Sequence, residues 1–193
     1  MFKDGKEEAR FGNFCLTQHE VIDGNTGRAV MSAAIRQLDG EPTQYLMVLM
    51  PLNVNLKAGM RAALYPKELW GPAQKNEKID ESKLKGVQLE YNLCHKGGCT
   101  AQVEATPQLI NDLKSFGGFA AFAITSDGQP LSLPVPLAGF AQAYDGPGID
   151  AKQFAASRQA LMQRLAQRQK ELADQQKKQA PQQPAAVAPA AKK

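Results

Sequence analysis

The sequence predicts an all-β protein: an antiparallel β-sandwich with one short internal helix and a C-terminal helical extension. Short apolar segments alternate with polar residues, and turn residues separate them about every ten positions. One internal segment has helical spacing, and the composition changes to Ala, Gln, Lys and Arg after Gly146-Pro147-Gly148. We therefore expect four parts: a polar arm (1–10), a sandwich domain (11–146), a basic helical extension (147–179) and a disordered Pro/Ala-rich tail (180–193).

The N-terminal half is predicted as strands joined by turns, with strands at 11–18, 29–38, 45–50 and 60–64. Tyr45–Met50 is a continuous apolar run, which favours a central strand buried on both faces; a short buried helix is the alternative. The polar stretch 66–86 exceeds the usual length of a connection, so we expect a long surface loop. Its Trp70 either holds this loop against the core or stacks on a ligand.

A cysteine hairpin is predicted at the centre of the chain, between Val87 and Thr106. The segments on both sides of Cys94-His95-Lys96-Gly97-Gly98-Cys99 alternate between apolar and polar residues, and the Gly-Gly pair suits a tight reversal. The pattern favours a disulfide between Cys94 and Cys99. A zinc site that also uses His95 and Cys15 is an alternative, but Cys-x4-Cys is wider than typical zinc knuckles. A redox-active pair is expected as Cys-x-x-Cys at the start of a helix, and the spacing of Cys94 and Cys99 does not match that motif. Because the chain has three cysteines, Cys15 is expected to be an unpaired thiol.

The C-terminal half is predicted to begin with the internal helix. Thr106 is a capping residue and Pro107 suits the first helical position, after which Leu109, Ile110, Leu113 and Phe116 share a face and Gly117 ends the helix. Strands follow at 119–125 and 131–137. Because proline cannot donate to a strand ladder, Pro134 and Pro136 place the last strand at a sheet edge.

The extension 151–179 has the composition of a helix, with a thin apolar stripe at Phe154, Leu161, Leu165 and Leu172. A weak coiled coil, contact with an acidic surface and a solvated linker are the alternatives. The net charge of +4 is uneven: nine Lys or Arg and three acidic residues lie from Asp150 onward, which gives +6 there and −2 elsewhere. A fold-wide basic surface is excluded, and we expect no nucleic-acid partner. No apolar run reaches the roughly 20 residues of a transmembrane helix.

The sequence nominates no catalytic residue, cofactor or metal. His19 and His95 are possible general bases, but neither has a recognisable nucleophile nearby, and no phosphate-binding glycine motif or paired-carboxylate signature is present. We therefore expect a protein that is not an enzyme; a glycan- or lipid-binding module is the alternative. The polar segment Met1–Arg10 is unlike a secretory signal and suggests the cytosol, whereas the cysteine hairpin favours an oxidising compartment.

Three segments together resemble the bacterial invasion-associated locus B family: Leu49–Gly59, Cys94–Ala101 and Leu133–Phe140. They are similar to the family's strand-and-turn "PLGV-L-AG", its hairpin "C-x-x-x-GC-A" and its final "PVSLAGF", in the same order across 11–144. The resemblance implies an exported periplasmic or envelope-associated β-sandwich with paired cysteines and no established enzyme activity. Some members are linked to host-cell entry and virulence, which implies a protein or envelope-surface partner.

The chain departs from the family pattern at its start. Family members usually begin with a signal peptide and then a strand with a tryptophan and a cysteine, which pairs with the cysteine that matches Cys15. Because neither is present before Cys15 here, we expect the natural start to lie upstream of Met1.

Overall fold

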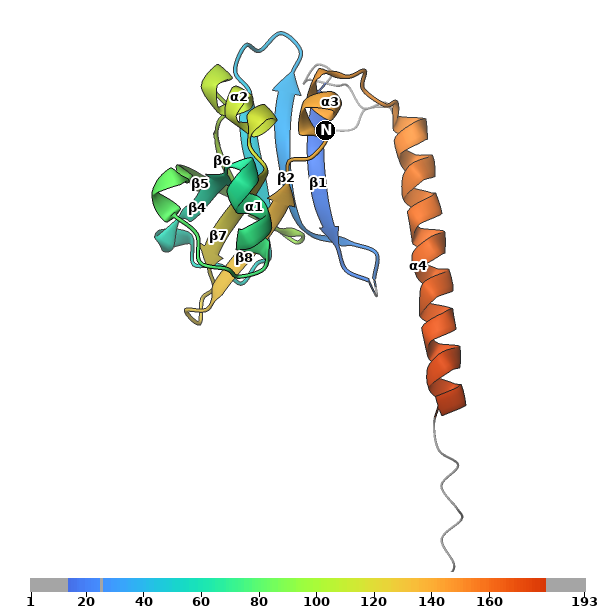
Figure 1. Ribbon diagram of the computed structural model, residues 1–193. Coiled ribbons are helices and arrows are strands. Elements are labelled where there is room, and N and C mark those ends of the chain that lie inside the picture. The colour runs from blue at the N-terminus through green and yellow to red at the C-terminus, as the bar shows by residue number, and fades with distance from the viewer. Residues whose placement is uncertain (1–13, 25, 180–193) are drawn as a thin grey trace, which may run out of the picture. The chain divides into compact units, whose positions relative to one another are not determined.

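A computed structural model describes residues 14–24 and 26–179 of the chain (Figure 1). One compact unit comprises residues 14–23 and 28–148, and the second comprises residues from 149 onward together with the turn around 24–27. The predicted arm (1–10) and tail (180–193) lie outside the described residues, as does the start of the strand expected at 11–18.

Eight strands form one sheet in the order β1-β2-β3-β6-β5-β4-β7-β8, and every neighbouring pair is antiparallel. The strands are β1 (Phe14–Ile22), β2 (Ala29–Leu38), β3 (Tyr45–Met50), β4 (Met60–Tyr65), β5 (Lys85–His95), β6 (Gly98–Glu104), β7 (Gly118–Ile124) and β8 (Pro130–Pro136). Short 3-10 turns lie at η1 (Leu56–Ala58) and η2 (Glu81–Lys83). The prediction of a mainly antiparallel β structure is confirmed, with four helices among the described residues in addition to the sheet, and β8 lies at an edge as its prolines predict.

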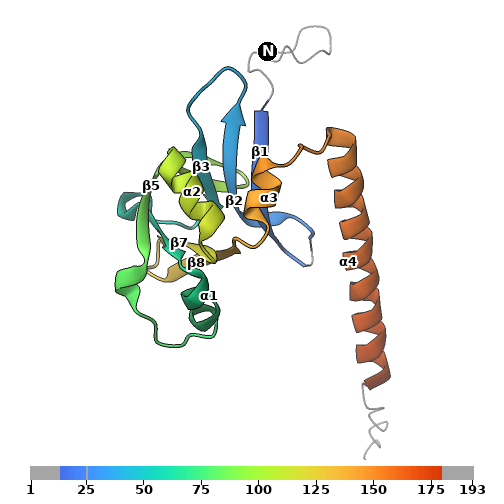
Figure 2. The ribbon, with the colours of Figure 1, turned by 45° about the horizontal axis from the view of Figure 1, so that its top comes forward.

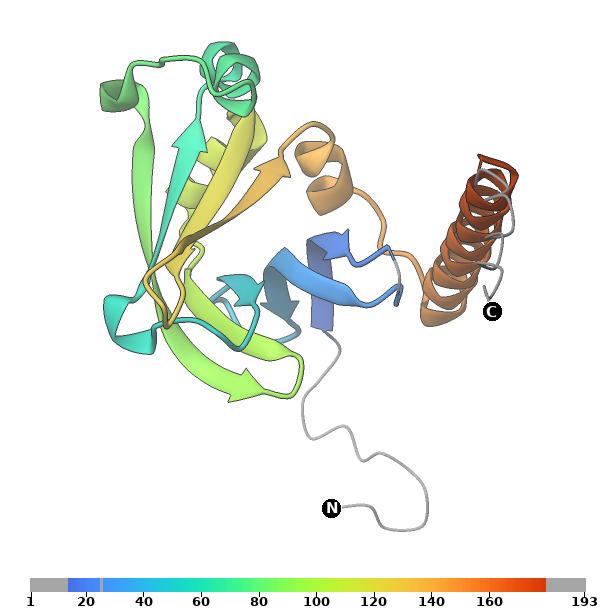
Figure 3. The same ribbon diagram turned by 90° about the horizontal axis from the view of Figure 1, so that it is seen from below.

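The strands do not form two stacked sheets. The sheet curls into a half-barrel, which Figure 3 shows from below. The long strand β5 is the reason, because its first half (85–89) pairs with β4 and its second half (90–95) pairs with β6. A bulge between Tyr91 and Leu93 bends β5 within the second pairing. The two predicted layers are therefore the two halves of a single continuous sheet, and the sandwich expectation is not confirmed.

The core fills the concave face of this sheet. Alternate residues of neighbouring strands point inward, so that the fully buried side chains include Ile35, Val48, Met50, Met60, Leu64, Leu89, Phe119 and Leu133. Strand β3 is central and is not a helix, but it is fully buried on this face alone: Leu46, Val48 and Met50 are buried, whereas Tyr45, Met47 and Leu49 are half-buried. The expectation that β3 is buried on both faces is therefore wrong.

Helix α2 (Pro107–Ser115) adds its apolar face to the same core through Leu109, Ile110 and Leu113. Its start follows the sequence prediction, because the Thr106 hydroxyl accepts a hydrogen bond from the Leu109 N–H at 3.2 Å. Lys85 of β5 forms an ion pair with Asp112 of α2 at 2.7 Å. The predicted C-cap at Gly117 is wrong, because the cap residue is Phe116.

The predicted surface loop 66–86 contains a helix, α1 (Lys67–Gln74), as well as η2. Gly71 and Pro72 lie inside α1, and because both residue types have low helix propensity, the sequence pattern does not predict this helix. Trp70 of α1 is half-buried and meets the Tyr65 ring edge-on, with ring centroids 5.5 Å apart. A Cβ added to Gly118 would lie 2.0 Å from Trp70 Cδ2. The indole therefore packs directly on the backbone at the start of β7, and the structure supports the anchoring interpretation of Trp70.

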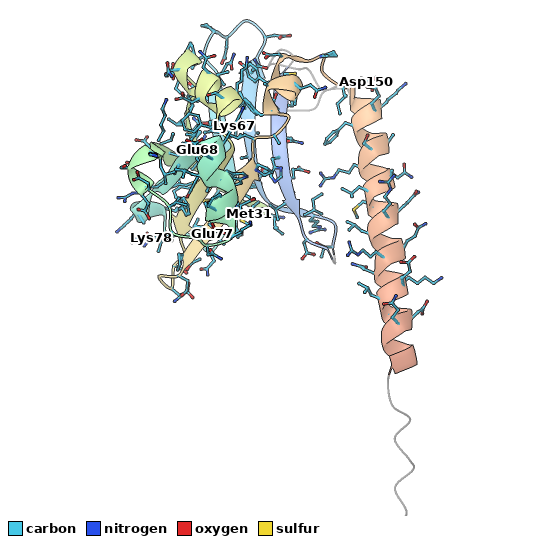
Figure 4. The ribbon with its side chains drawn as sticks, in the orientation of Figure 1. Met31, Lys67, Glu68, Glu77, Lys78 and Asp150 are labelled. Carbon is cyan, nitrogen blue, oxygen red and sulfur yellow. A yellow bond between two sulfur atoms is a disulfide. The ribbon has the colours of Figure 1, made fainter. Side chains whose placement is uncertain are left out.

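Two further helices follow β8: α3 (Phe140–Asp145), which no sequence pattern predicts, and α4 (Ala151–Gln179), which agrees with the predicted helical extension. The Gln153 N–H donates to the Asp150 carboxylate at 2.8 Å, so Asp150 caps the start of α4. Asp150 is labelled at this position in Figure 4. No helix within the described residues combines the length and the apolar character needed to span a membrane.

Candidate contact site at the open seam of the sheet

An apolar pocket of about 190 Å³ lies where the half-barrel fails to close. We call this region the open seam: it comprises the edge strand β1, its neighbour β2, the end of β8, and α3. The pocket floor is formed by Leu46, Leu113 and Phe119, and the walls include Thr17, His19, Ala33, Ile35, Val135, Leu137, Phe140 and Ala143. The two edge strands of the sheet, β1 and β8, therefore contribute residues to one cavity.

The strand register explains which β1 side chains line the pocket. Thr17 is opposite Ile35 and His19 is opposite Ala33, and both partners are buried on the concave face. Since side chains alternate along a strand, Thr17 and His19 point to the same concave side. Both are half-buried, and they are polar groups on an otherwise apolar wall. The pocket can therefore hold an apolar group and offer a hydroxyl and an imidazole to a polar neighbour of that group.

The two edge strands of the sheet differ in what they offer a partner. Within the described residues β1 pairs with β2 alone, so its other edge has no strand partner among them. On β8 the prolines 130, 134 and 136 share one parity, so their nitrogens point to the same side of the strand. Because β8 remains paired with β7, that side is the outer edge, and Ser132 is the one residue of this row that keeps an N–H. Strand addition is therefore favoured at β1 and hindered at β8.

Helix α3 forms one wall of the pocket and is held there by polar contacts. The Tyr144 hydroxyl donates to Gln44 Oε1 at 2.6 Å and accepts from Gln37 Nε2 at 3.3 Å. Lys114 of α2 forms an ion pair with Asp145 at 2.7 Å, and its Nζ lies 4.7 Å from the centroid of the Tyr144 ring. Figure 2 shows α3 in front of β1 and β2. These contacts to β2, the β2–β3 connection and α2 give the pocket a fixed wall.

The two histidines named by the sequence do not form a joint site. His19 lines the pocket, whereas His95 lies at the exposed turn of the β5–β6 hairpin, where its Nδ1 accepts the Gly97 N–H at 2.9 Å. Among the residues that line the pocket, none is Ser, Cys, Asp or Glu. The lining therefore lacks the carboxylate that would orient His19 as a base, although Thr17 supplies a hydroxyl on the same face.

The cysteines are arranged as the disulfide hypothesis predicts. Cys94 and Cys99 are cross-strand partners in the β5–β6 hairpin and are joined by a disulfide, with their Cα atoms 4.0 Å apart. The zinc alternative is wrong for this structure, because the two sulfurs are bonded to each other. Gly98 has a φ of 140°, and a Cβ there would lie 2.3 Å from the Met50 carbonyl oxygen, so the hairpin approaches β3 closely. Cys15 is an exposed free thiol at the start of β1.

The fold and the site define a class: a β half-barrel flanked by short helices, with a cystine hairpin and an apolar pocket beside an edge strand that has one strand partner within the described residues. Residues 3–148 match the Invasion associated locus B (IalB) protein family. The chain therefore belongs to that family, and the resemblance seen in the sequence is confirmed.

Among solved structures, the chain is similar to the crystal structure of invasion associated protein B from Bartonella henselae. That similarity has a TM-score of 0.49 and 14% sequence identity, and it covers 70% of this chain and 91% of that one. No curated protein matches the sequence. Helix α4 lies beyond the family match, which ends at residue 148.

Proposed function

We propose that this chain is a non-enzymatic protein of the bacterial envelope that acts by binding a partner protein at the open seam. The observation that carries the proposal is the edge of β1, which has no strand partner within the described residues, directly beside an apolar pocket. An exposed sheet edge recognises an extended peptide through main-chain hydrogen bonds, and an adjacent pocket selects one of its alternate side chains. We expect the partner segment to be an extended strand with one large apolar residue.

The dimensions of the pocket agree with this kind of occupant. A volume of about 190 Å³ is slightly larger than an engineered cavity of about 150 Å³ that accepts benzene. One leucine or phenylalanine side chain is therefore a suitable guest. Phe14 and Leu16, which are 64% and 42% exposed, lie on the opposite face of β1 from Thr17 and His19 and would contact the side chains of an added strand that point away from the pocket. The absence of acidic residues and of Ser or Cys from the lining supports binding rather than catalysis.

Export to an oxidising compartment is the second part of the proposal. The disulfide between Cys94 and Cys99 supports it, because structural disulfides persist in the periplasm and are rare in the cytosol. Intact-mass measurement after thiol alkylation, on protein from its native host, tests this part. We expect Cys15 to be alkylated without reductant, and Cys94 and Cys99 to be alkylated only after reduction. Three reactive thiols without reductant would overturn the envelope location.

A second candidate, a lipid-binding module, is favoured by the same apolar lining. A short acyl chain would fit the pocket equally well in place of a side chain, and Thr17 and His19 would then lie near the polar end of the lipid. The glycan alternative has less support, because the exposed phenylalanines Phe14, Phe122 and Phe154 belong to different elements and do not form a platform.

Site-specific photocrosslinking in the native host distinguishes these occupants. A photoreactive residue at His19, which lines the pocket from the concave side of β1, should yield a discrete protein adduct; one at Gln88, on β5, should not. Ala143→Trp fills the pocket and should abolish the His19 adduct, whereas Gln142→Trp, at an exposed position of α3 outside the lining, should not. A lipid-sized adduct would favour the second candidate. No adduct, or a protein adduct unaffected by Ala143→Trp, would overturn binding at the open seam.

A further inference from the structure

Helix α4 carries an apolar stripe and a charge pattern that neither the family match nor the open seam explains. At 100° per residue, Phe154, Leu161, Leu165 and Leu172 fall within about 40° of one another around the helix. Met162, with Ala155, Ala166 and Ala173, widens this stripe to about 140°. Phe154 is 42%, Leu161 39%, Met162 39% and Leu172 51% exposed. Gln169 lies in the same sector and donates to the Gly24 carbonyl, and Met162 lies against Gly27, so the turn around 24–27 covers part of the stripe. The apolar side chains that remain exposed form a surface that a partner can cover.

The charged residues of α4 are ordered around that stripe. Arg164 and Arg168 border it on one side, and Lys152 and Lys170 border it on the other. The two acidic residues, Glu171 and Asp174, lie on the far side, within about 30° of the direction opposite the stripe centre. Cations at both boundaries and acids at the polar centre are complementary to a flat anionic surface that accepts the apolar stripe.

We propose that α4 binds an anionic lipid surface and lies in the plane of the headgroups with its apolar stripe inserted. Lys and Arg at the polar–apolar boundary keep their stems on the apolar side and place their charges among the headgroups. Arg158 lies inside the stripe and is half-buried, so it is not one of the boundary cations. Glu171 and Asp174 face water and avoid repulsion by the lipids. This inference goes beyond the proposed function and does not depend on a partner at the open seam.

A second copy of the chain is the competing occupant. The spacing 154, 158, 161, 165, 168, 172 is a heptad seam, but it places Arg158 and Arg168 among its core positions. Two charged core positions in a seam of six disfavour a coiled coil, because each copy would bury both guanidinium groups against the other. At a lipid surface Arg168, which borders the stripe, reaches the headgroups, so the charge pattern favours lipid over self-association.

Co-sedimentation of the full chain with vesicles tests the proposal. We expect binding to vesicles of phosphatidylethanolamine with phosphatidylglycerol and little binding to vesicles of phosphatidylcholine alone. The pair Leu161→Ala with Leu172→Ala should weaken binding at least tenfold, since alanine keeps the helix and removes apolar contact. The matched pair Gln163→Ala with Gln167→Ala, on the polar side, should have no effect. Removal of each boundary cation, as in Lys152→Gln, should weaken binding about fivefold. Glu171→Gln, a control that removes an acid, should not weaken it.

Sedimentation velocity without lipid accompanies each variant. Lipid binding that falls in the Leu161/Leu172 pair and in added salt, with an unchanged sedimentation coefficient, would support the proposal. Equal binding to both kinds of vesicle, binding unaffected by the α4 variants, or no binding would overturn it. A dimer that dissociates in the Leu161/Leu172 pair and does not sediment with vesicles would assign the stripe to a second copy instead. None of these outcomes depends on the occupant of the open seam, so the two proposals fail separately.

Discussion

Replacement of Gly118 by alanine should displace Trp70 and loosen α1 from the sheet. The added Cβ would lie 2.0, 2.1 and 2.4 Å from three atoms of the indole. Carbon atoms in ordinary contact are about 3.5–4.0 Å apart, so the ring would have to move by roughly 1.5 Å. The backbone φ of Gly118 is not in the left-handed region, and the steric contact alone therefore decides the result.

The expected cost follows from the half-buried state of Trp70. If about 100 Å² of the ring is covered, its exposure costs about 2.5 kcal/mol at 25 cal/mol per Å². Loss of the edge-on contact with Tyr65 adds about 1 kcal/mol. Alanine in a strand regains about 0.5–1 kcal/mol relative to glycine. We therefore expect a net loss of about 2.5–3 kcal/mol in the free energy of unfolding.

Urea unfolding followed by tryptophan fluorescence measures this effect, because Trp70 is the one tryptophan in the chain. The Gly118→Ala variant should unfold at lower urea, and its native emission should shift to longer wavelength. Gly71→Ala is the matched control: it lies in α1 with nothing within 4 Å of the added Cβ, and should stabilise the protein by about 0.5–1 kcal/mol.

A double-variant cycle identifies the source of the loss. In a Trp70→Ala background, with unfolding followed by circular dichroism, the Gly118→Ala change should cost nothing, because the obstructing ring is gone. Wild-type stability and emission in the Gly118→Ala single variant would refute the packing argument. An equal loss with and without Trp70 would place its cause elsewhere in β7.

Two further predictions concern the cystine hairpin and a buried hydroxyl. Cys94→Ser should lower the free energy of unfolding by about 2 kcal/mol, the loop-closure value for so short a ring, and leave the fold cooperative in urea unfolding. Tyr91→Phe should be neutral or stabilising by up to about 1 kcal/mol at pH 7, because the Tyr91 hydroxyl is buried without a hydrogen-bond partner among the described residues. Burial raises the pKa of Tyr91 above 10.0, so the unfolded chain loses this proton at lower pH than the folded protein does, and wild-type stability falls as the pH rises above 10. Tyr91→Phe should therefore lose less stability than wild type in urea titrations above pH 10.

Opposite results would change these interpretations. Complete unfolding of Cys94→Ser at modest temperature would mean that the disulfide supports the whole half-barrel and not the hairpin alone. Cys15→Ser is its control and should have no effect on stability, since that thiol is exposed and free. A loss of more than about 1 kcal/mol in Tyr91→Phe at pH 7 would show that the hydroxyl has a bonding partner after all.

Local patterns were enough to predict the elements whose causes lie within a few residues. The bounds of β2 and β3 agree with the alternating and continuous apolar segments that predict them. Helix α2 begins where Thr106 and Pro107 place it, and α4 spans the predicted 151–179. The helices α1 and α3 were missed: Gly71 and Pro72 interrupt α1, and α3 has six residues, too few for a periodic pattern.

The cystine hairpin is a local feature that one short segment is enough to specify: two alternating stretches, a Gly-Gly turn and two cysteines five residues apart. The open seam is not local. Its pocket joins β1 to the end of β8 and α3, more than 100 residues later, and exists because β5 links both halves into one curled sheet. Likewise, no property of residues 117–118 alone reveals that Trp70 packs on them. Alternation specifies which face of a strand is buried, but the strand order specifies what lies opposite that face, and that order depends on contacts between residues distant in the chain.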